Sequence, residues 1–130
     1  MTQIQSYLTF GGNCREAMLF YKTCFGGKLT LQSVEESPMA EQWPASAQKS
    51  ILHASLQKGR TILLGSDIGG TKHDGNTVSL AVKCSSDAEI KTIFTLLARE
   101  GKVTHDLHDF FDGTIGALTD KFGINWILKL

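Results

Sequence analysis

Hydrophobic and polar residues alternate over residues 4–10, which predicts a β-strand. Gly11-Gly12 interrupts the alternation. Apolar residues then recur at the three- and four-residue spacing of an amphipathic helix, at Ala17, Phe20, Tyr21 and Cys24. This stretch therefore predicts a strand followed by a helix.

Residues that favour helix ends flank the apolar stripe. Asn13 and Glu16 have the spacing of a capping box, which satisfies the first backbone N–H groups of a helix. Gly26-Gly27 provides residues that tolerate the left-handed conformation in which many helices end. Residues 28–34 then predict a second strand.

The same order of elements recurs later in the chain. Residues 77–82 alternate as a strand, and Ser86 with Glu89 forms a second capping box. A second helical stripe follows at Ile90, Ile93, Phe94 and Leu97. Gly101 ends that helix, and the next residues repeat the Gly-Lys-apolar-Thr pattern that follows the first helix. The chain therefore contains an internal repeat.

Each half continues with two more predicted strands, at residues 51–57, 61–65, 114–119 and 125–130. Residues 35–49 predict a long loop, and residues 67–76 a linker between the halves. The result is an α+β fold of two βαβββ modules, residues 1–67 and 76–130, within a single domain, 1–130. Each helix covers one face of its sheet and leaves the other face open.

Composition narrows the function classes. Thirteen Lys and Arg balance thirteen Asp and Glu, so no strong field attracts nucleic acid or an acidic membrane. No apolar run approaches 18 residues, and no leader pattern is found, so we expect a cytoplasmic protein. Three cysteines without a C-x-x-C spacing predict buried, reduced thiols: Cys14, Cys24 and Cys84.

Strand alternation selects candidate site residues. Leu52, Ala54 and Leu56 form the apolar, helix-facing set of their strand, which places His53 with Ile51 and Ser55 on the open face. There His53 would orient a ligand or transfer a proton; a structural histidine is the equal alternative. The other predicted ligand-binding residues are the hydroxyl-bearing Tyr7, Thr9, Thr77 and Ser79 and the apolar Phe122 and Trp43.

A second group of polar residues surrounds His105-x-x-His108. Residues three apart on a strand point to opposite faces, so the two imidazoles would not converge without a turn. We therefore expect a solvated loop here, as also at His73-Asp74 in the linker. Asn13, Glu16, Asp120 and Gly123 are expected to be structural, as cap, capping-box partner and turn formers.

Three blocks resemble the PhnB-like branch of the glyoxalase/bleomycin-resistance, or vicinal oxygen chelate, superfamily. The first is Tyr7-Leu8-x-Phe10-x-Gly12-Asn13-Cys14-x-Glu16-Ala17-x-x-Phe20-Tyr21-x-x-x-Phe25-Gly26. The second is His53-Ala54-x-Leu56-x-x-Gly59 with Leu63-x-x-Ser66-Asp67, and the third is Gly116-x-x-x-Asp120-x-Phe122-Gly123-x-x-Trp126-x-Leu128. The chain departs from the branch at Ile124, Lys121 and Phe111-Asp112, which stand where it usually has His, Pro and Trp-Gly.

The resemblance implies a cup closed by the two sheets, often in a homodimer. Metal-dependent relatives carry ligands at positions that correspond here to Gln5 or Ser6, Leu63, Thr77 and Ile127. These side chains do not supply the three or so ligands of a catalytic metal, so no metal and no other cofactor is expected. The branch is sometimes labelled a ubiquinone methyltransferase, but no glycine-rich nucleotide loop follows a strand.

The leading hypothesis is a homodimeric protein that binds a small polar-aromatic or oxyanionic molecule without the usual metal. No nucleic acid and no membrane is expected as a partner. The alternative is a lyase, isomerase or dioxygenase of the same superfamily, with a metal or with His53 as its acid or base. A dimer that serves only as an interaction module is a third hypothesis.

Overall fold

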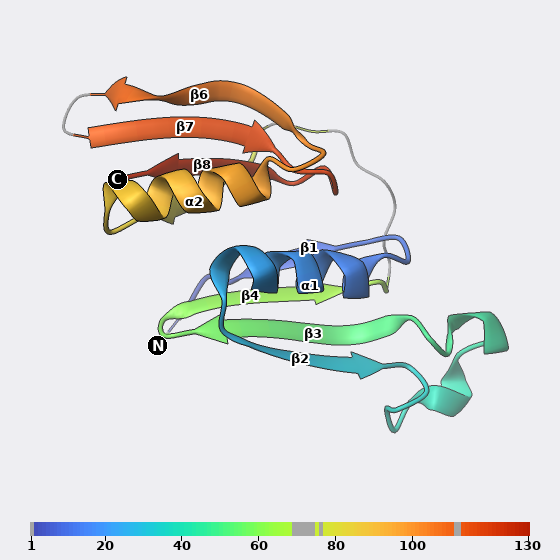
Figure 1. Ribbon diagram of the computed structural model, residues 1–130. Coiled ribbons are helices and arrows are strands. Elements are labelled where there is room, and N and C mark those ends of the chain that lie inside the picture. Colours follow the sequence, from blue (N-terminus) through green and yellow to red (C-terminus); the bar gives the residue numbers. More distant parts are fainter. Residues whose placement is uncertain (1, 69–74, 76, 111–112) are drawn as a thin grey trace. The chain divides into compact units, whose positions relative to one another are not determined.

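The computed structural model describes residues 2–68, 75, 77–110 and 113–130. It divides into two compact units, Met1–Lys72 and His73–Leu130, each with one four-stranded sheet and one α-helix (Figure 1). The predicted motifs at His73-Asp74 and Phe111-Asp112, and most of the predicted linker, lie outside the described residues.

The first unit has the predicted βαβββ order. Its elements are β1 (Ser6–Thr9), α1 (Cys14–Phe25), β2 (Lys28–Ser33), β3 (Ile51–Lys58) and β4 (Thr61–Ser66). The strands lie in the order β1-β4-β3-β2. β1 pairs with β4 in parallel, and the other pairs are antiparallel.

The second unit repeats this topology. Its elements are β5 (Leu80–Lys83), α2 (Asp87–Leu97), β6 (Lys102–Phe110), β7 (Gly113–Thr119) and β8 (Asn125–Lys129). The order is β5-β8-β7-β6, again with the first and last strands parallel. The predicted α+β fold of two βαβββ modules is therefore confirmed, as two separate four-stranded sheets. Whether the sheets close a cup stays a prediction.

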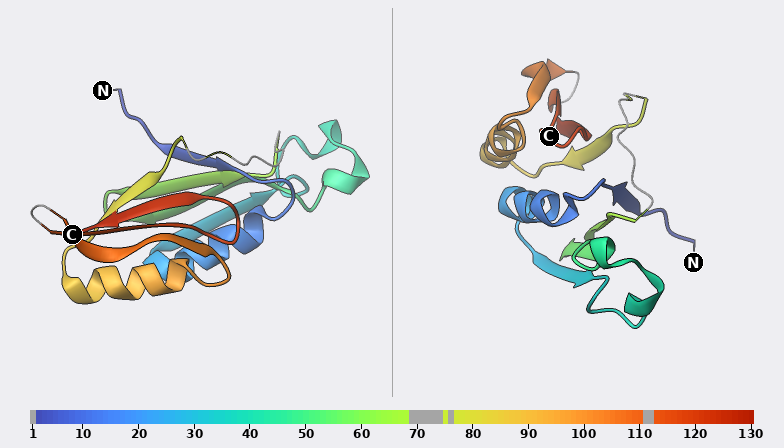
Figure 2. Two further views of the ribbon diagram at one scale, coloured as in Figure 1. Left: turned by 90° about the horizontal axis from the view of Figure 1, so that it is seen from above. Right: turned by 90° about the vertical axis from the view of Figure 1, so that its right-hand side faces the viewer.

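In each unit the helix lies against one face of its own sheet (Figure 2). A glycine marks the closest approach, because a Cβ atom added to Gly65 would lie 3.2 Å from the Met18 sulfur of α1. A Cβ atom on Gly116 would lie 2.8 Å from the Phe94 ring of α2. Below, the sheet face that its helix does not cover is called the open face.

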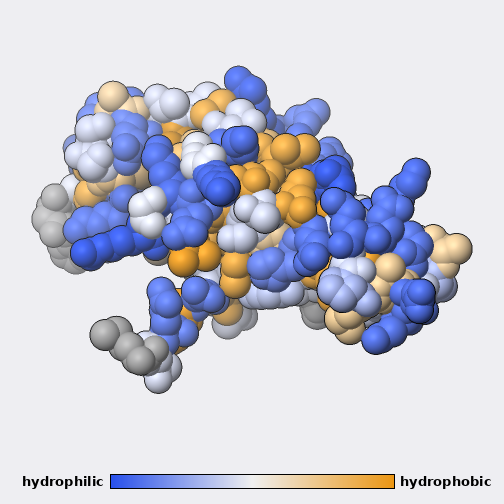
Figure 3. All heavy atoms as spheres, turned by 90° about the horizontal axis from the view of Figure 1, so that it is seen from below, coloured by the Kyte–Doolittle hydropathy of each residue, from blue (hydrophilic) through white to orange (hydrophobic). Residues whose placement is uncertain are grey.

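Apolar side chains from the helices and the helix-facing strand positions form the core of each unit. The largest fully buried ones are Tyr21, Met18, Ile51 and Leu56 in the first unit and Ile90, Leu97, Leu118 and Leu128 in the second. Some apolar surface remains exposed, and Figure 3 shows a face on which apolar side chains gather between polar ones. All three cysteines are buried, as predicted.

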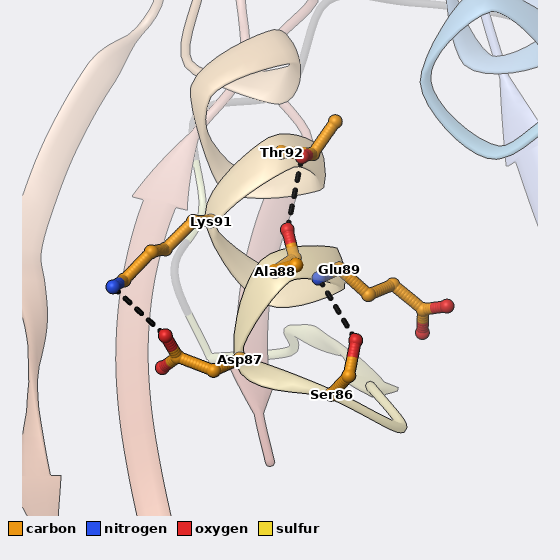
Figure 4. Close-up of polar contacts among 6 residues, drawn as sticks. All are labelled: Ser86, Asp87, Ala88, Glu89, Lys91 and Thr92. Carbon is orange, nitrogen blue, oxygen red and sulfur yellow. Dashed lines mark hydrogen bonds and ion pairs between the residues drawn. The ribbon is translucent and has the colours of Figure 1, made fainter.

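The two helices begin differently. At α2 the Ser86 hydroxyl accepts a hydrogen bond from the Glu89 backbone N–H at 3.1 Å, as the capping box predicts (Figure 4). The Glu89 carboxylate accepts from the Ser85 N–H, one residue earlier than expected. Asp87 and Lys91, one turn apart, form an exposed ion pair.

At α1 the predicted cap is wrong. The Asn13 side chain makes no capping hydrogen bond. Instead one oxygen of the Asp67 carboxylate accepts hydrogen bonds from the N–H groups of Gly12 (2.9 Å) and Cys14 (3.0 Å), and the other accepts from Ile51 (2.9 Å). A residue assigned to the linker thus connects β4, the start of α1 and the start of β3.

Two strands differ by three or more residues from their predicted extent. β5 begins at Leu80, three residues later than expected. β6 runs from Lys102 to Phe110 and includes His105 and His108, which the sequence placed in a loop. The predicted loop at residues 35–49 holds two short 3₁₀ helices, Ala40–Gln42 and Ala45–Ala47.

The helices of the described part, α1 with 12 residues and α2 with 11, are both too short and too polar to cross a bilayer, which takes about 20 apolar residues.

Candidate functional site

Extra residues in β6 bring two histidines to the same face of the second sheet. His105 pairs with Ala117 and His108 with Ile115, so three steps along β6 match two steps along β7. Ala117 and Ile115 are two residues apart and share a face, and their partners share it with them. The sequence argument assumed unbroken alternation, which this β-bulge removes.

That shared face is the open face. Gly116, which lies between Ile115 and Ala117, is the residue that approaches the Phe94 ring of α2. The side chains at 115 and 117 therefore point away from the helix, and His105 and His108 point with them. β6 has a second irregularity between Val103 and His105, which pair with the neighbouring residues Leu118 and Ala117 of β7. Thr104 is the extra residue at this point of the strand.

The open face of the second sheet holds a hollow of about 590 Å³. This volume lies within the range of small-molecule sites, about 300–1,000 Å³. Its apolar lining includes Ile115, Ala117 and Ile127 from the two central strands. Its polar lining comprises Ser79, Lys102, Thr104, His105, His108, Thr119 and Asn125. An apolar surface bordered by hydroxyl, amide and basic groups can bind a small molecule with an apolar body and a polar end.

The His108 ring is held by the backbone. Its Nδ1 atom lies 2.8 Å from the Asp106 carbonyl oxygen, and because a carbonyl only accepts, Nδ1 is the donor. Asn125 is held at the other end of the hollow: its amide nitrogen donates to the Gly75 carbonyl at 2.7 Å, and its side-chain oxygen accepts from the Thr119 hydroxyl at 2.8 Å. These bonds fix two polar groups of the lining before any ligand binds.

Of the ligand-binding residues predicted in the second unit, Ser79 lines the hollow. Thr77 is exposed and precedes β5. Phe122 lies in the turn between β7 and β8, where its backbone N–H donates to the Asp120 carboxylate at 2.9 Å. The prediction missed His105, His108 and Thr104, the residues of the bulged strand.

The predicted residues of the first unit share the open face of its sheet. Tyr7 pairs with Leu64, and Leu64 with Ser55, so these side chains form one row. Alternation adds Thr9 and His53 to the same face, and both are exposed. The structure thus brings Tyr7, Thr9 and His53 to one surface, and their role stays a prediction.

One detail of that strand argument is corrected. β3 also has an irregularity, because His53 pairs with Gln32 while Ile51 pairs with Ser33, the next residue of β2. The extra residue, Leu52, shifts the alternation, so Ile51 rather than Leu52 is the buried, helix-side residue. His53 keeps the open side.

Trp43 lies outside the sheet, at the end of the first 3₁₀ helix. The Gln48 side chain holds this segment, donating to the carbonyl oxygens of Ala40 (2.8 Å) and Trp43 (3.0 Å). The indole nitrogen of Trp43 is buried and has no hydrogen-bond partner among the described residues.

The positions of the superfamily metal ligands carry no donor set in this chain. Leu63 is buried and alternates with Leu64, so it points to the helix side, and its open-face neighbours Ile62 and Leu64 are aliphatic too. Ile127 lies on the open face between two alanines, its partners in β5 and β7. Within the described ranges, no three His, Cys, Asp or Glu residues are grouped to hold a metal ion.

The glycine pair before α1 is not arranged for a nucleotide. A helix N-terminus after Gly-Gly can bind a phosphate through its N–H groups. Here the N–H groups of Gly12 and Cys14 already donate to the carboxylate of Asp67. The Asp67 carboxylate therefore takes the place at this helix N-terminus that the phosphate of a nucleotide would occupy.

Comparison with known proteins agrees with this architecture. Residues 2–129 match the model of the family described as 3-demethylubiquinone-9 3-methyltransferase. The chain belongs to this family. The PhnB protein from Bacillus cereus carries the same family description, in agreement with the PhnB-like resemblance of the sequence blocks.

The similar proteins span nearly the whole chain. Protein PA1353 from Pseudomonas aeruginosa is 33% identical, with 98% of this chain and 96% of that one covered and a TM-score of 0.86. The PhnB protein from Bacillus cereus is 28% identical, with 99% of each chain covered and a TM-score of 0.76. Protein YjdN from Escherichia coli K12 is 27% identical, over 98% of this chain and 94% of its own.

More distant structures share the fold alone. The fosfomycin resistance protein FosX from Mesorhizobium loti is 8% identical, with a TM-score of 0.64 over 99% of this chain and 92% of that one.

Proposed function

We propose that this chain binds a small organic molecule in the hollow on the open face of the second sheet, without a metal at the superfamily positions. The observation that carries the proposal is the β6 bulge, which turns His105 and His108 to the same side over an apolar lining. The size of the hollow, about 590 Å³, supports the proposal, because it lies in the range of small-molecule sites.

The local chemistry favours binding over metal-dependent catalysis. Leu63, Thr77 and Ile127 cannot replace the histidine and carboxylate ligands of metal-dependent relatives, since two have aliphatic side chains and one a weak hydroxyl donor. The polar groups that face the hollow are hydroxyl, amide, imidazole and ammonium groups, which serve hydrogen bonding and charge recognition.

The described residues do not favour the methyltransferase activity that the family's description names. A methyltransferase needs a site for its methyl donor. Among the described residues, one glycine-rich turn leads from a strand into a helix, Gly11-Gly12 before α1. The N–H groups of Gly12 and Cys14, which could bind an anionic group of a methyl donor, already donate hydrogen bonds to the Asp67 carboxylate.

The test is a thermal-shift screen of purified protein against a metabolite panel, followed by NMR titration with the strongest hit. We expect amide shifts concentrated in β6, β7 and β8. His105→Gln should reduce the ligand-induced stabilisation, whereas the matched control His53→Gln, on the first sheet, should reduce it less. Shifts confined to the first sheet, with His53→Gln as the damaging variant, would place the site on the other unit and refute the proposal.

A further inference from the structure

We infer that the ligand of this hollow is a small organic acid, whose carboxylate or phosphate is recognised by Lys102 and His105 and whose apolar body lies over the central strands. The inference rests on the proposed function and adds the chemical class of the ligand. It comes from the distribution of charge over the open face of the second sheet.

The open face of the second sheet carries basic side chains. Lys102 pairs with Thr119 and His105 with Ala117, and both line the hollow. Lys83 and Lys129 pair with each other, and Lys129 also pairs with Ile115 in the row of His108, so they lie on the same face beyond the hollow. Thirteen basic and thirteen acidic residues balance over the whole chain, so this face departs from the average.

Among the described residues, acidic side chains are absent from the lining of the hollow. Asp109 of β6 pairs with Thr114, which alternates with Ile115 and so lies on the helix side. Asp106, in the bulge, is exposed and is not part of the lining. An anion here would meet cations and hydroxyl donors without a carboxylate among the lining groups.

The lining of the hollow also indicates the chemistry of the ligand's uncharged part. Ile115, Ala117 and Ile127 form adjacent positions of the two central strands and provide an apolar floor. The hydroxyls of Ser79 and Thr104 border it and can donate to further oxygens. A volume of about 590 Å³ accommodates a compact metabolite and is small for a polymer. These features fit an acid with an apolar or aromatic body.

The experiment compares benzoate with benzamide, which has the same ring and nearly the same shape but no charge, and adds inorganic phosphate as an anion without an apolar body. Binding is followed by NMR titration of the ¹⁵N-labelled full chain. We expect benzoate to shift the amides of His105 and Ala117 and to bind about a hundredfold more tightly than benzamide, since each of the two charge-assisted contacts, to Lys102 and His105, contributes about a factor of ten. Phosphate should shift the same β6 amides more weakly.

Variants identify the groups that recognise the anion. Lys102→Gln and His105→Gln should each weaken benzoate binding about tenfold and leave benzamide binding nearly unchanged, because each removes one charge-assisted contact. Lys22→Gln, an exposed lysine of α1, is the matched control and should change neither.

The outcomes separate this inference from the proposed function. Equal affinity for benzoate and benzamide, with shifts in the hollow, would overturn the organic-acid inference and leave small-molecule binding intact. Shifts that occur only outside β6, β7 and β8 would overturn both.

Discussion

Asp120 should be the most stability-critical carboxylate of the second unit. It is 3% exposed and lies between β7 and β8. One of its oxygens accepts hydrogen bonds from the backbone N–H groups of Phe122 (2.9 Å) and Ile124 (3.0 Å). The other accepts from the indole nitrogen of Trp126 at 2.8 Å. One side chain therefore holds both the turn and a core tryptophan.

The expected loss follows from these three bonds. In Asp120→Ala, each of the two turn amides loses a bond to a charged acceptor, and the buried Trp126 N–H is left without this acceptor. Together these losses should lower the free energy of unfolding by about 3–5 kcal/mol, counting about 1–1.5 kcal/mol for each amide and about 1–2 for the indole. In Asp120→Asn one oxygen can still accept from the turn, but the amide NH₂ faces the indole N–H, so the loss should be about 1–3 kcal/mol.

Urea denaturation monitored by tryptophan fluorescence measures these differences. Asp109→Ala, which removes an exposed carboxylate of β6, is the matched control and should stay within about 0.5 kcal/mol of the parent chain. An Asp120→Ala variant within about 1 kcal/mol of the parent would show that the turn does not depend on this carboxylate.

Three further predictions concern packing, reactivity and assembly. Gly116→Val should destabilise the protein by about 1–3 kcal/mol in the same assay, because its side chain would displace the Phe94 ring, whereas Gly75→Ala, with open space around it, should be neutral. Burial raises the pKa of Cys14 to about 12, so at pH 8 only about one thiol in 10⁴ is ionised, and a thiol reagent should label Cys14 only after denaturation; labelling at the rate of an exposed thiol would contradict this. We also propose a homodimer, for which light scattering should give about 28 kDa, twice the 14.2 kDa chain; a 14 kDa particle at micromolar concentration would refute it.

The fold was predictable because the two kinds of periodicity are strong in this chain. Alternation marked the strands, the three- and four-residue spacing marked both helices, and the recurrence of one pattern marked the repeat. Ser86 was identified as a cap because its partner is only three residues away. Asp67 was not identified, because its partners at Gly12 and Ile51 are 55 and 16 residues distant, and only the folded chain brings them together.

The candidate site was missed for a related reason. A bulge inserts a residue that reverses the faces of all residues beyond it, and no local pattern marks the insertion at His105. One signal was present: a strand predicted over 114–119 needs an antiparallel partner of equal length, and the Gly-Lys-apolar-Thr pattern at Gly101 is too short to be that partner. The partner had to continue through the histidines, as β6 does to Phe110.

The parallel pairing of the first and last strands in each unit has a consequence for synthesis on the ribosome. Ser6 of β1 pairs with Leu63 of β4, which is translated 57 residues later. Leu80 of β5 pairs with Trp126 of β8, which is translated 46 residues later. Until β4 has emerged, the nascent chain has an unpaired β1 and a helix with no complete sheet to cover. Once β4 has emerged, the first unit has all its strands before β8, the strand with which β5 must pair, is translated. The protein is therefore organised to fold in two consecutive steps, in which the second sheet is completed after the first and has little opportunity to exchange strands with it.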